Sequence, residues 1–188
     1  MSCSRLSAVA IACFVMAGFA LPQLAAAQPA PARPADPFGQ EITLTAKTMV
    51  LAKGAANWDT AFDTLVSTFK TVAAALDKQG IKPSGPAMTI YTASDDTGFE
   101  FMAGFPVAEE PKQPLPAEMS VGKSPEGRAL KFVHRGSYDS MDTTYEAITN
   151  HLEAKGLEAK DLFVEQYVTD PVTTPEEKLM IEVYVPVK

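Results

Sequence analysis

A glutamate stands between two aromatic residues near the carboxyl end of the chain, in the stretch DLFVEQYVTD (161–170). Successive side chains of a β-strand alternate between its faces, so we expect Phe163, Glu165 and Tyr167 to lie on one side. A carboxylate on a packed aromatic face is costly unless it is paired or hydrogen-bonded. The pattern leaves two interpretations open: a solvated acid on a half-exposed sheet, or a carboxylate that attracts a cation.

The final strand, LMIEVYVPV (179–187), carries a second acid, and it too is followed by a tyrosine two positions later. Its aliphatic residues share one face, which we expect to meet the helices, and its polar and aromatic residues share the other. If Val164 of the preceding strand joins that helix-facing core, the acids of both strands lie on the opposite side. The sequence then predicts one concave surface that carries two carboxylates and two tyrosines, namely Glu165, Tyr167, Glu182 and Tyr184.

Two amphipathic helices are predicted to position these strands. Apolar residues recur at three- and four-residue steps in NWDTAFDTLVSTFKTVAAALDKQG (57–80) and in SYDSMDTTYEAITNHLEAKG (137–156). The patterns end at Gly80 and Gly156, and glycine is the usual residue just beyond a helix C-terminus. Ser137 is among the candidate caps at the start of the second helix.

The helices belong to a repeated unit. When their terminal glycines are aligned, the apolar positions coincide, with Phe69 matching Tyr145. A predicted strand precedes each helix (42–52 and 128–135) and two strands follow it. This strand-helix-strand-strand pattern, present twice, predicts an α+β fold with pseudo-two-fold symmetry. We expect an antiparallel sheet with two helices on one face and a cleft between the halves.

A cleft between the halves would surround a ligand with side chains from both. We expect Tyr138, at the start of the second helix, and Met102, on the final strand of the first half, to form its walls together with Tyr167 and Tyr184. Aromatic faces bind organic cations through contacts worth roughly 0.5–2 kcal/mol each. The predicted ligand is therefore a small molecule that is amphipathic or cationic.

The first residues are predicted to be an export signal. Residues 1–27 combine Arg5, an apolar run and an Ala-Ala-Ala cleavage pattern, and the run is too short and too interrupted for a stable membrane span. The stretch QPAPARPADPFGQ (28–40) reads as an extended Pro/Ala-rich tether. The rest of the chain, 41–188, is expected to be one domain located in the periplasm, with its halves at about 41–110 and 119–188.

Composition narrows the class of partner. Both cysteines, Cys3 and Cys13, belong to the predicted signal, so the mature chain has no disulfide and no thiolate for a structural zinc site. Without Arg5 the chain has 15 basic and 23 acidic residues, a net charge of −8. Such a surface disfavours nucleic acid and anionic lipid as partners. The oligomeric state does not follow from these features.

The second half resembles a known family. Gly136-Ser137-Tyr138 at the helix entry, Glu165 on the next strand and Pro186-Val187 at the end resemble the GyrI-like, or AraC-type effector-binding, domain family. The resemblance covers roughly 41–188 and implies a duplicated strand-helix-strand-strand fold that binds small, often aromatic or cationic molecules in a groove between its halves. It also implies that Glu165 is the central acid of the pocket.

The regulators of this family carry a helix-turn-helix domain as well. Outside the predicted signal and tether, this chain has no room for one, so the resemblance is to the stand-alone members. A transcriptional role is therefore not expected.

Other functions stay open at this point. Some relatives in this family hydrolyse reactive small molecules, so Glu165 is a candidate general base for a hydrolase of small electrophilic compounds. An exposed sheet face could instead engage an envelope protein. His134 could ligate haem, because SOUL-type haem-binding proteins resemble this fold, but a strand histidine is more often simply hydrogen-bonded. Glu165 and Glu182 alone are a thin ligand set for a metal, so we expect binding without a cofactor.

Overall fold

The structure is a computed structural model that describes residues 38–188. The predicted signal peptide and all but the end of the predicted tether lie outside the described residues. The strands are β1 (Gln40–Leu44), β2 (Thr48–Asn57), β3 (Met88–Ser94), β4 (Gly98–Pro106), β5 (Met119–Lys123), β6 (Gly127–Arg135), β7 (Phe163–Tyr167) and β8 (Met180–Pro186). The helices are α1 (Ala61–Lys78) and α2 (Met141–Lys155), with short 3-10 turns η1 (Trp58–Thr60), η2 (Tyr138–Ser140) and η3 (Glu176–Lys178).

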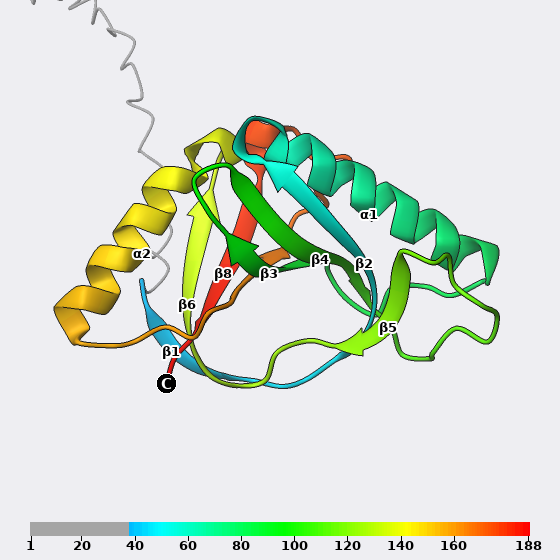
Figure 1. The fold of residues 1–188 in the computed structure, drawn as a ribbon, viewed down its shortest axis with the longest axis horizontal. Coiled ribbons are helices and arrows are strands. Elements are labelled where there is room, and N and C mark those ends of the chain that lie inside the picture. Colours follow the sequence, from blue (N-terminus) through cyan, green and yellow to red (C-terminus); the bar gives the residue numbers. More distant parts are fainter. Residues whose placement is uncertain (1–37) are drawn as a thin grey trace, which may run out of the picture. The chain divides into compact units, whose positions relative to one another are not determined.

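All eight strands form one antiparallel sheet in the order β1-β6-β8-β7-β3-β4-β2-β5. Both helices pack on the same face of this sheet, and their N-terminal ends approach each other above its middle (Figure 1). The order is symmetric about the central β3–β7 pair. The predicted α+β architecture with pseudo-two-fold symmetry is therefore confirmed.

Each half donates its first strand to the other half. β1 pairs with β6 of the second half, and β5 pairs with β2 of the first. The single strand predicted over 42–52 is consequently two strands, because residues 45–47 carry the chain from β1, at one edge of the sheet, to β2, next to the opposite edge. β5 was not expected at all, so the repeated unit is strand-strand-helix-strand-strand.

The helix ends follow the predicted signals. The side chain of Asn57 accepts hydrogen bonds from the Thr60 backbone N (3.0 Å) and Oγ1 (2.8 Å), which satisfies a donor at the start of η1. Ser137 accepts a longer bond from the Asp139 backbone N (3.4 Å). Gly80 and Gly156 both have positive φ (69° and 62°), a conformation that glycine adopts without a steric penalty.

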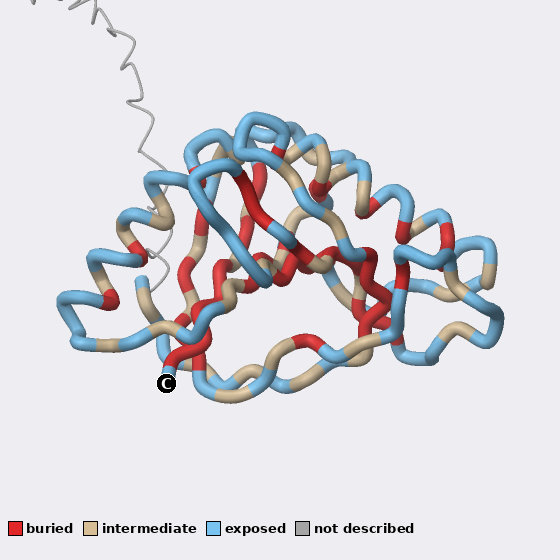
Figure 2. Tube along the Cα trace, in the orientation of Figure 1, coloured by how far each residue is buried: buried red, intermediate tan, exposed pale blue. Residues whose placement is uncertain are grey.

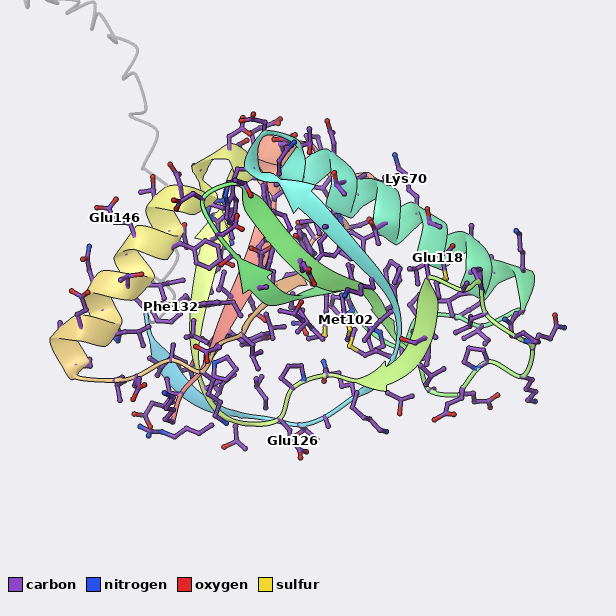
Figure 3. All side chains as sticks on the ribbon, in the orientation of Figure 1. Lys70, Met102, Glu118, Glu126, Phe132 and Glu146 are labelled. Atoms are coloured by element: carbon purple, nitrogen blue, oxygen red, sulfur yellow. The ribbon has the colours of Figure 1, made fainter. Side chains whose placement is uncertain are left out.

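The sheet is buried on both faces. The helix face carries the larger core, which includes Phe69, Phe101, Phe132, Ile181 and Val183. The helix-free face carries a second core formed by Met49, Leu51, Met88, Ile90, Val164 and Tyr184. Figure 2 shows buried residues along the middle strands and exposed residues on the outer turns of the helices. Figure 3 labels Phe132 between β6 and α2, and Met102 on β4.

Two crossing connections close the helix-free face. Residues 45–47, between β1 and β2, and residues 124–126, between β5 and β6, run beneath the sheet (Figure 1). They are joined by two hydrogen bonds of 2.9 Å, from the Lys47 backbone N to Ser124 Oγ and from the Ser124 backbone N to the Lys47 carbonyl oxygen. The Lys47 ammonium also donates to Gln166 Oε1 (3.3 Å), which ties this connection to β7.

The predicted orientation of β7 is wrong. In its register on β8, Glu165 pairs with Val183, so Glu165 and Tyr167 lie on the helix face. Glu182 and Tyr184 lie on the other face, and the four residues do not share one surface. The reason is that β7 is buried on both sides, so its alternation contains no signal for which side meets the helices. In the described range, 38–188, no helix is long and apolar enough to cross a membrane.

Candidate functional site

A cavity of about 720 Å³ lies above the helix face of the sheet, where the N-terminal ends of α1 and α2 meet. Both halves contribute to it, as predicted for a cleft between repeats. Its aromatic lining consists of Trp58, Phe62 and Tyr91 from the first half, and Tyr138, Tyr145 and Phe163 from the second. Such a volume with mostly apolar walls is typical of sites for small organic ligands.

The two helix starts bring their aromatic side chains into contact. Phe62, in the first turn of α1, stacks on Tyr138 of η2 with ring centroids 5.0 Å apart and an interplanar angle of 24°. Tyr145 of α2 packs edge-on against Phe163 of β7 at 5.8 Å. Trp58 is 52% exposed and packs on Phe99, and its indole Nε1 donates to the Asp95 carbonyl oxygen (3.0 Å).

Glu165 lies beneath this aromatic lining with no exposed surface. Its Oε1 accepts a hydrogen bond from the Tyr145 hydroxyl (2.8 Å), and its Oε2 accepts from the hydroxyls of Tyr91 (2.8 Å) and Tyr167 (2.7 Å). The Tyr138 hydroxyl lies 2.8 Å from the Tyr91 hydroxyl. Because Tyr91 donates its only proton to Glu165, Tyr138 donates to Tyr91.

No basic side chain within residues 38–188 forms an ion pair with Glu165. Burial raises the pKa of its carboxyl group, and the phenol hydrogen bonds act in the opposite direction. Burial, followed by the nearby Glu165 charge, raises the pKa of each surrounding tyrosine well above 10.0, so all four phenols stay protonated as donors. Among the described residues, the acid of this site therefore has neutral donors as its only hydrogen-bond partners.

Glu182 is held differently on the helix-free face. Its Oε1 accepts from the Lys131 ammonium (3.1 Å), and its Oε2 accepts from Gln166 Nε2 (3.0 Å) and the Tyr184 hydroxyl (2.5 Å). Met102 faces the same side, since it pairs with Ile90 and packs against that core. The walls predicted from Glu182, Tyr184 and Met102 therefore do not belong to this cavity.

The structure places some of the predicted site residues at this cavity and others away from it. Glu165 and Tyr138 were expected there, and Tyr138 does line the cavity. Tyr145 was expected only as one of the apolar positions of the second helix, and Tyr91 was not singled out. A compositional signal was available: the chain has five tyrosines, and four of them gather at one acid.

The haem and metal alternatives receive no geometric support. Both ring nitrogens of His134 are hydrogen-bonded, Nδ1 to Thr144 Oγ1 (2.7 Å) and Nε2 to the Ser137 carbonyl oxygen (3.0 Å). Over the described part of the chain, no group of three or more His, Cys, Asp or Glu residues is placed to hold a metal ion.

Comparisons with known proteins agree with this geometry. The family model for the GyrI-like small molecule binding domain matches residues 40–188. Among solved structures, EcmrR in a complex with DNA has a TM-score of 0.65 at 16% identity, covering 80% of this chain and 57% of EcmrR. SAV2435 bound to tetraphenylphosphonium has a TM-score of 0.54 at 16% identity, covering 80% and 93%. A hydrolase from Listeria innocua has a TM-score of 0.56 at 13% identity, covering 80% and 92%.

These identities are low, so the likeness to solved structures is a likeness of fold. The chain spans little more than half the length of EcmrR. No curated protein matches it. The match of the family model over nearly the whole described region, together with the shared fold, shows that this chain belongs to the GyrI-like small-molecule binding domain family.

Proposed function

We propose that residues 40–188 bind an amphipathic organic cation in the cavity between the two halves. The observation that carries this proposal is Glu165: a fully buried carboxylate beneath the cavity, held by phenols and lacking a basic partner in the described chain. A buried charge is costly to maintain unless it is compensated. A ligand cation would supply the missing compensation.

The phenols suit such a ligand for a second reason. Tyr91, Tyr138 and Tyr145 line the cavity while Glu165 itself does not, so a bound cation would contact rings and hydroxyl oxygens above the carboxylate. Each favourable ring contact is worth roughly 0.5–2 kcal/mol, depending on desolvation. The hydroxyl protons of Tyr91 and Tyr145 point at Glu165, and that of Tyr138 points at Tyr91, so oxygen lone pairs remain for the ligand side.

The chain provides its own optical probe for a test. Trp58 is the only tryptophan in the sequence, and it lines the cavity. Tetraphenylphosphonium, the compound bound to SAV2435, should change its fluorescence in a saturable way. Tetraphenylborate has nearly the same shape and the opposite charge, so it should not bind. Equal binding of both ions, or binding of neither, would contradict the proposal.

Hydrolysis is a second candidate, favoured by the raised pKa of the Glu165 carboxyl, which brings a carboxylate closer to the range of a general base. It is separated from binding by turnover. A small electrophilic compound incubated with the protein should give a product, detected by mass spectrometry, at a rate that Glu165→Gln lowers to the uncatalysed value. A compound that saturates the site and remains intact would exclude catalysis.

We further propose that the domain is a binding protein exported to the periplasm, with cleavage after Ala27. The charge of Arg5, the following apolar run and the alanine pattern support this location. Cell fractionation and intact mass provide the test. The expected species is periplasmic and begins at Gln28, whereas a cytoplasmic protein with its first residues intact would contradict the proposal.

A further inference from the structure

Five exposed carboxylates line the same cavity, and we call them the acidic rim. They are Asp59, Asp63, Asp139, Asp142 and Glu176. Two come from the first half and three from the second, so the rim spans both halves. No Lys, Arg or His lines the cavity with them, and no ion pair formed within residues 38–188 includes a rim residue.

Helix stability alone explains the rim poorly. Acids are favourable near helix N-termini because each helix presents roughly half a positive charge there. Two helices start at this cavity, so their dipoles amount to about one positive charge against five carboxylates. Glu176 lies in the β7–β8 connection rather than in either helix. The rim therefore has a large excess of negative charge.

The excess negative charge of the rim lies at the same cavity as the buried acid Glu165. The rim alone would be an ordinary solvated surface, but it surrounds a cavity beneath which lies Glu165, a fully buried carboxylate held only by neutral donors. Rings and apolar side chains, including Phe62 and Met141, line the cavity together with the rim acids. The cavity therefore has one acid beneath its aromatic lining and five exposed acids among its lining residues.

We infer that the site selects dications: molecules with two positive groups joined by an apolar spacer, one group above Glu165 and the other at the acidic rim. This inference rests on the proposed function, since it concerns the same cavity. The contribution of the rim should be modest, because exposed ion pairs are weak and salt screens them. The contribution of Glu165 should persist in salt, because it is buried.

The test compares matched ligands and follows Trp58 fluorescence. The dications are hexamethonium and decamethonium, which carry two trimethylammonium groups on chains of six and ten methylenes, and the monocation is decyltrimethylammonium. At low salt, Asp59→Asn/Asp63→Asn should weaken the better dication by about fivefold, since one exposed pair is worth up to about that factor. The monocation should change by less than twofold, and high salt should remove the difference.

A control variant holds the charge change constant. Glu109→Gln/Glu110→Gln removes two acids from the β4–β5 connection, beside a different cavity at the C-terminal end of α1. It should leave the affinity for both ligand types within twofold of the parent. A matching loss in this control would assign the effect to net charge and overturn the role of the rim.

The remaining outcomes separate this inference from the function on which it rests. If the rim variant leaves the dications unaffected, or weakens the monocation by the same factor, selection of dications is wrong while cation binding stands. If the parent binds neither the monocation nor the dications, and tetraphenylphosphonium also fails, the proposed function itself is wrong.

Discussion

Glu165 and Glu182 lie on neighbouring strands, on opposite faces of one sheet, and each begins the same local pattern. In both cases the tyrosine two positions later donates its hydroxyl to the carboxylate, Tyr167 to Glu165 (2.7 Å) and Tyr184 to Glu182 (2.5 Å). The difference lies in the remaining partners. Glu182 has the ammonium of Lys131 at 3.1 Å, whereas Glu165 receives only two more phenols.

This difference distinguishes an acid that is paired within the protein from an acid that can pair with a ligand. When a lysine of the protein already compensates the charge of an acid, a ligand cation adds little further stabilisation. An acid held only by neutral donors has no counter-ion of its own, and the surrounding low-dielectric region strengthens the attraction between its ionised form and a ligand cation. The presence of a cavity on the side of Glu165 fits this division, since the helix-free face is closed by the crossing connections.

The largest expected effect is on ligand affinity. Glu165→Gln should weaken tetraphenylphosphonium binding by about 30-fold or more, because loss of one partner of a buried charge pair costs about 2 kcal/mol or more. Glu182→Gln should change affinity by less than twofold. Titration calorimetry of both variants measures the contrast, and equal losses would show that the two acids do not differ as proposed.

The next effect concerns the phenols. Tyr145→Phe removes one of three donors from a buried carboxylate, so the free energy of unfolding should fall by about 1.5–3 kcal/mol. Tyr184→Phe should cost about 1 kcal/mol, because Lys131 and Gln166 still satisfy Glu182. Urea denaturation at neutral pH gives both values. A larger loss in Tyr184→Phe would reverse the ranking of the two networks.

Replacing each acid by glutamine should change the free energy of unfolding in opposite directions. The pKa of Glu165 is raised in the folded state, so the folded protein loses stability as pH rises from the unfolded value, near 4.5, through the raised one. Without ligand, Glu165→Gln should therefore be more stable than the parent protein at pH 7. The difference in the free energy of unfolding should shrink as the pH falls towards 4.5. Glu182→Gln should be neutral or slightly destabilising, by at most about 1 kcal/mol, because it removes a half-buried ion pair.

Thermal denaturation of the parent and both variants across this pH range tests the prediction. A Glu165→Gln variant that is less stable than the parent at pH 7 would show that its charge is already compensated in the empty protein.

The smallest difference between the two faces of the sheet is expected at alkaline pH. All five tyrosines have pKa values raised by burial and by the nearby acids, on both faces of the sheet. The unfolded chain ionises near pH 10, so stability should fall above that pH and the phenols should titrate together on unfolding. Absorbance near 295 nm follows this directly. A phenol that ionises near pH 10 in the folded protein would identify one that the solvent reaches.

Much of the fold was predictable because its signals are local. The three- and four-residue spacing gave both helices, the glycines gave their ends, and the repeat gave the symmetry. The exchanged strands were not predictable in this way, because the alternation of 42–52 continues across the point where the chain leaves one edge for the other. Which edge a strand joins depends on pairing with residues far along the chain.

The site was predictable only in part for a related reason. Glu165 is identifiable from its aromatic neighbours, but the preceding residue, Val164, is just as buried on the other face. Each face also carries one polar residue, Glu165 or Gln166, so polarity does not show which face meets the helices. Tyr91 and Tyr145 each fit a core pattern, and their shared partner appears only when β3, α2 and β7 are assembled. The acidic rim escaped notice because acids at helix starts are common.

The exchange of edge strands bears on how the chain acquires its structure. Gln40, in the first strand to be synthesised, has its partner at Lys131, and the central pair joins Thr89 to Glu165. Contacts between such distant positions carry a large loop-closure cost and slow folding. Because β3 of the first half pairs with β7 of the second, neither repeat has all its neighbouring strands until translation is almost finished. We therefore expect the chain to complete its sheet only after most of it has been synthesised.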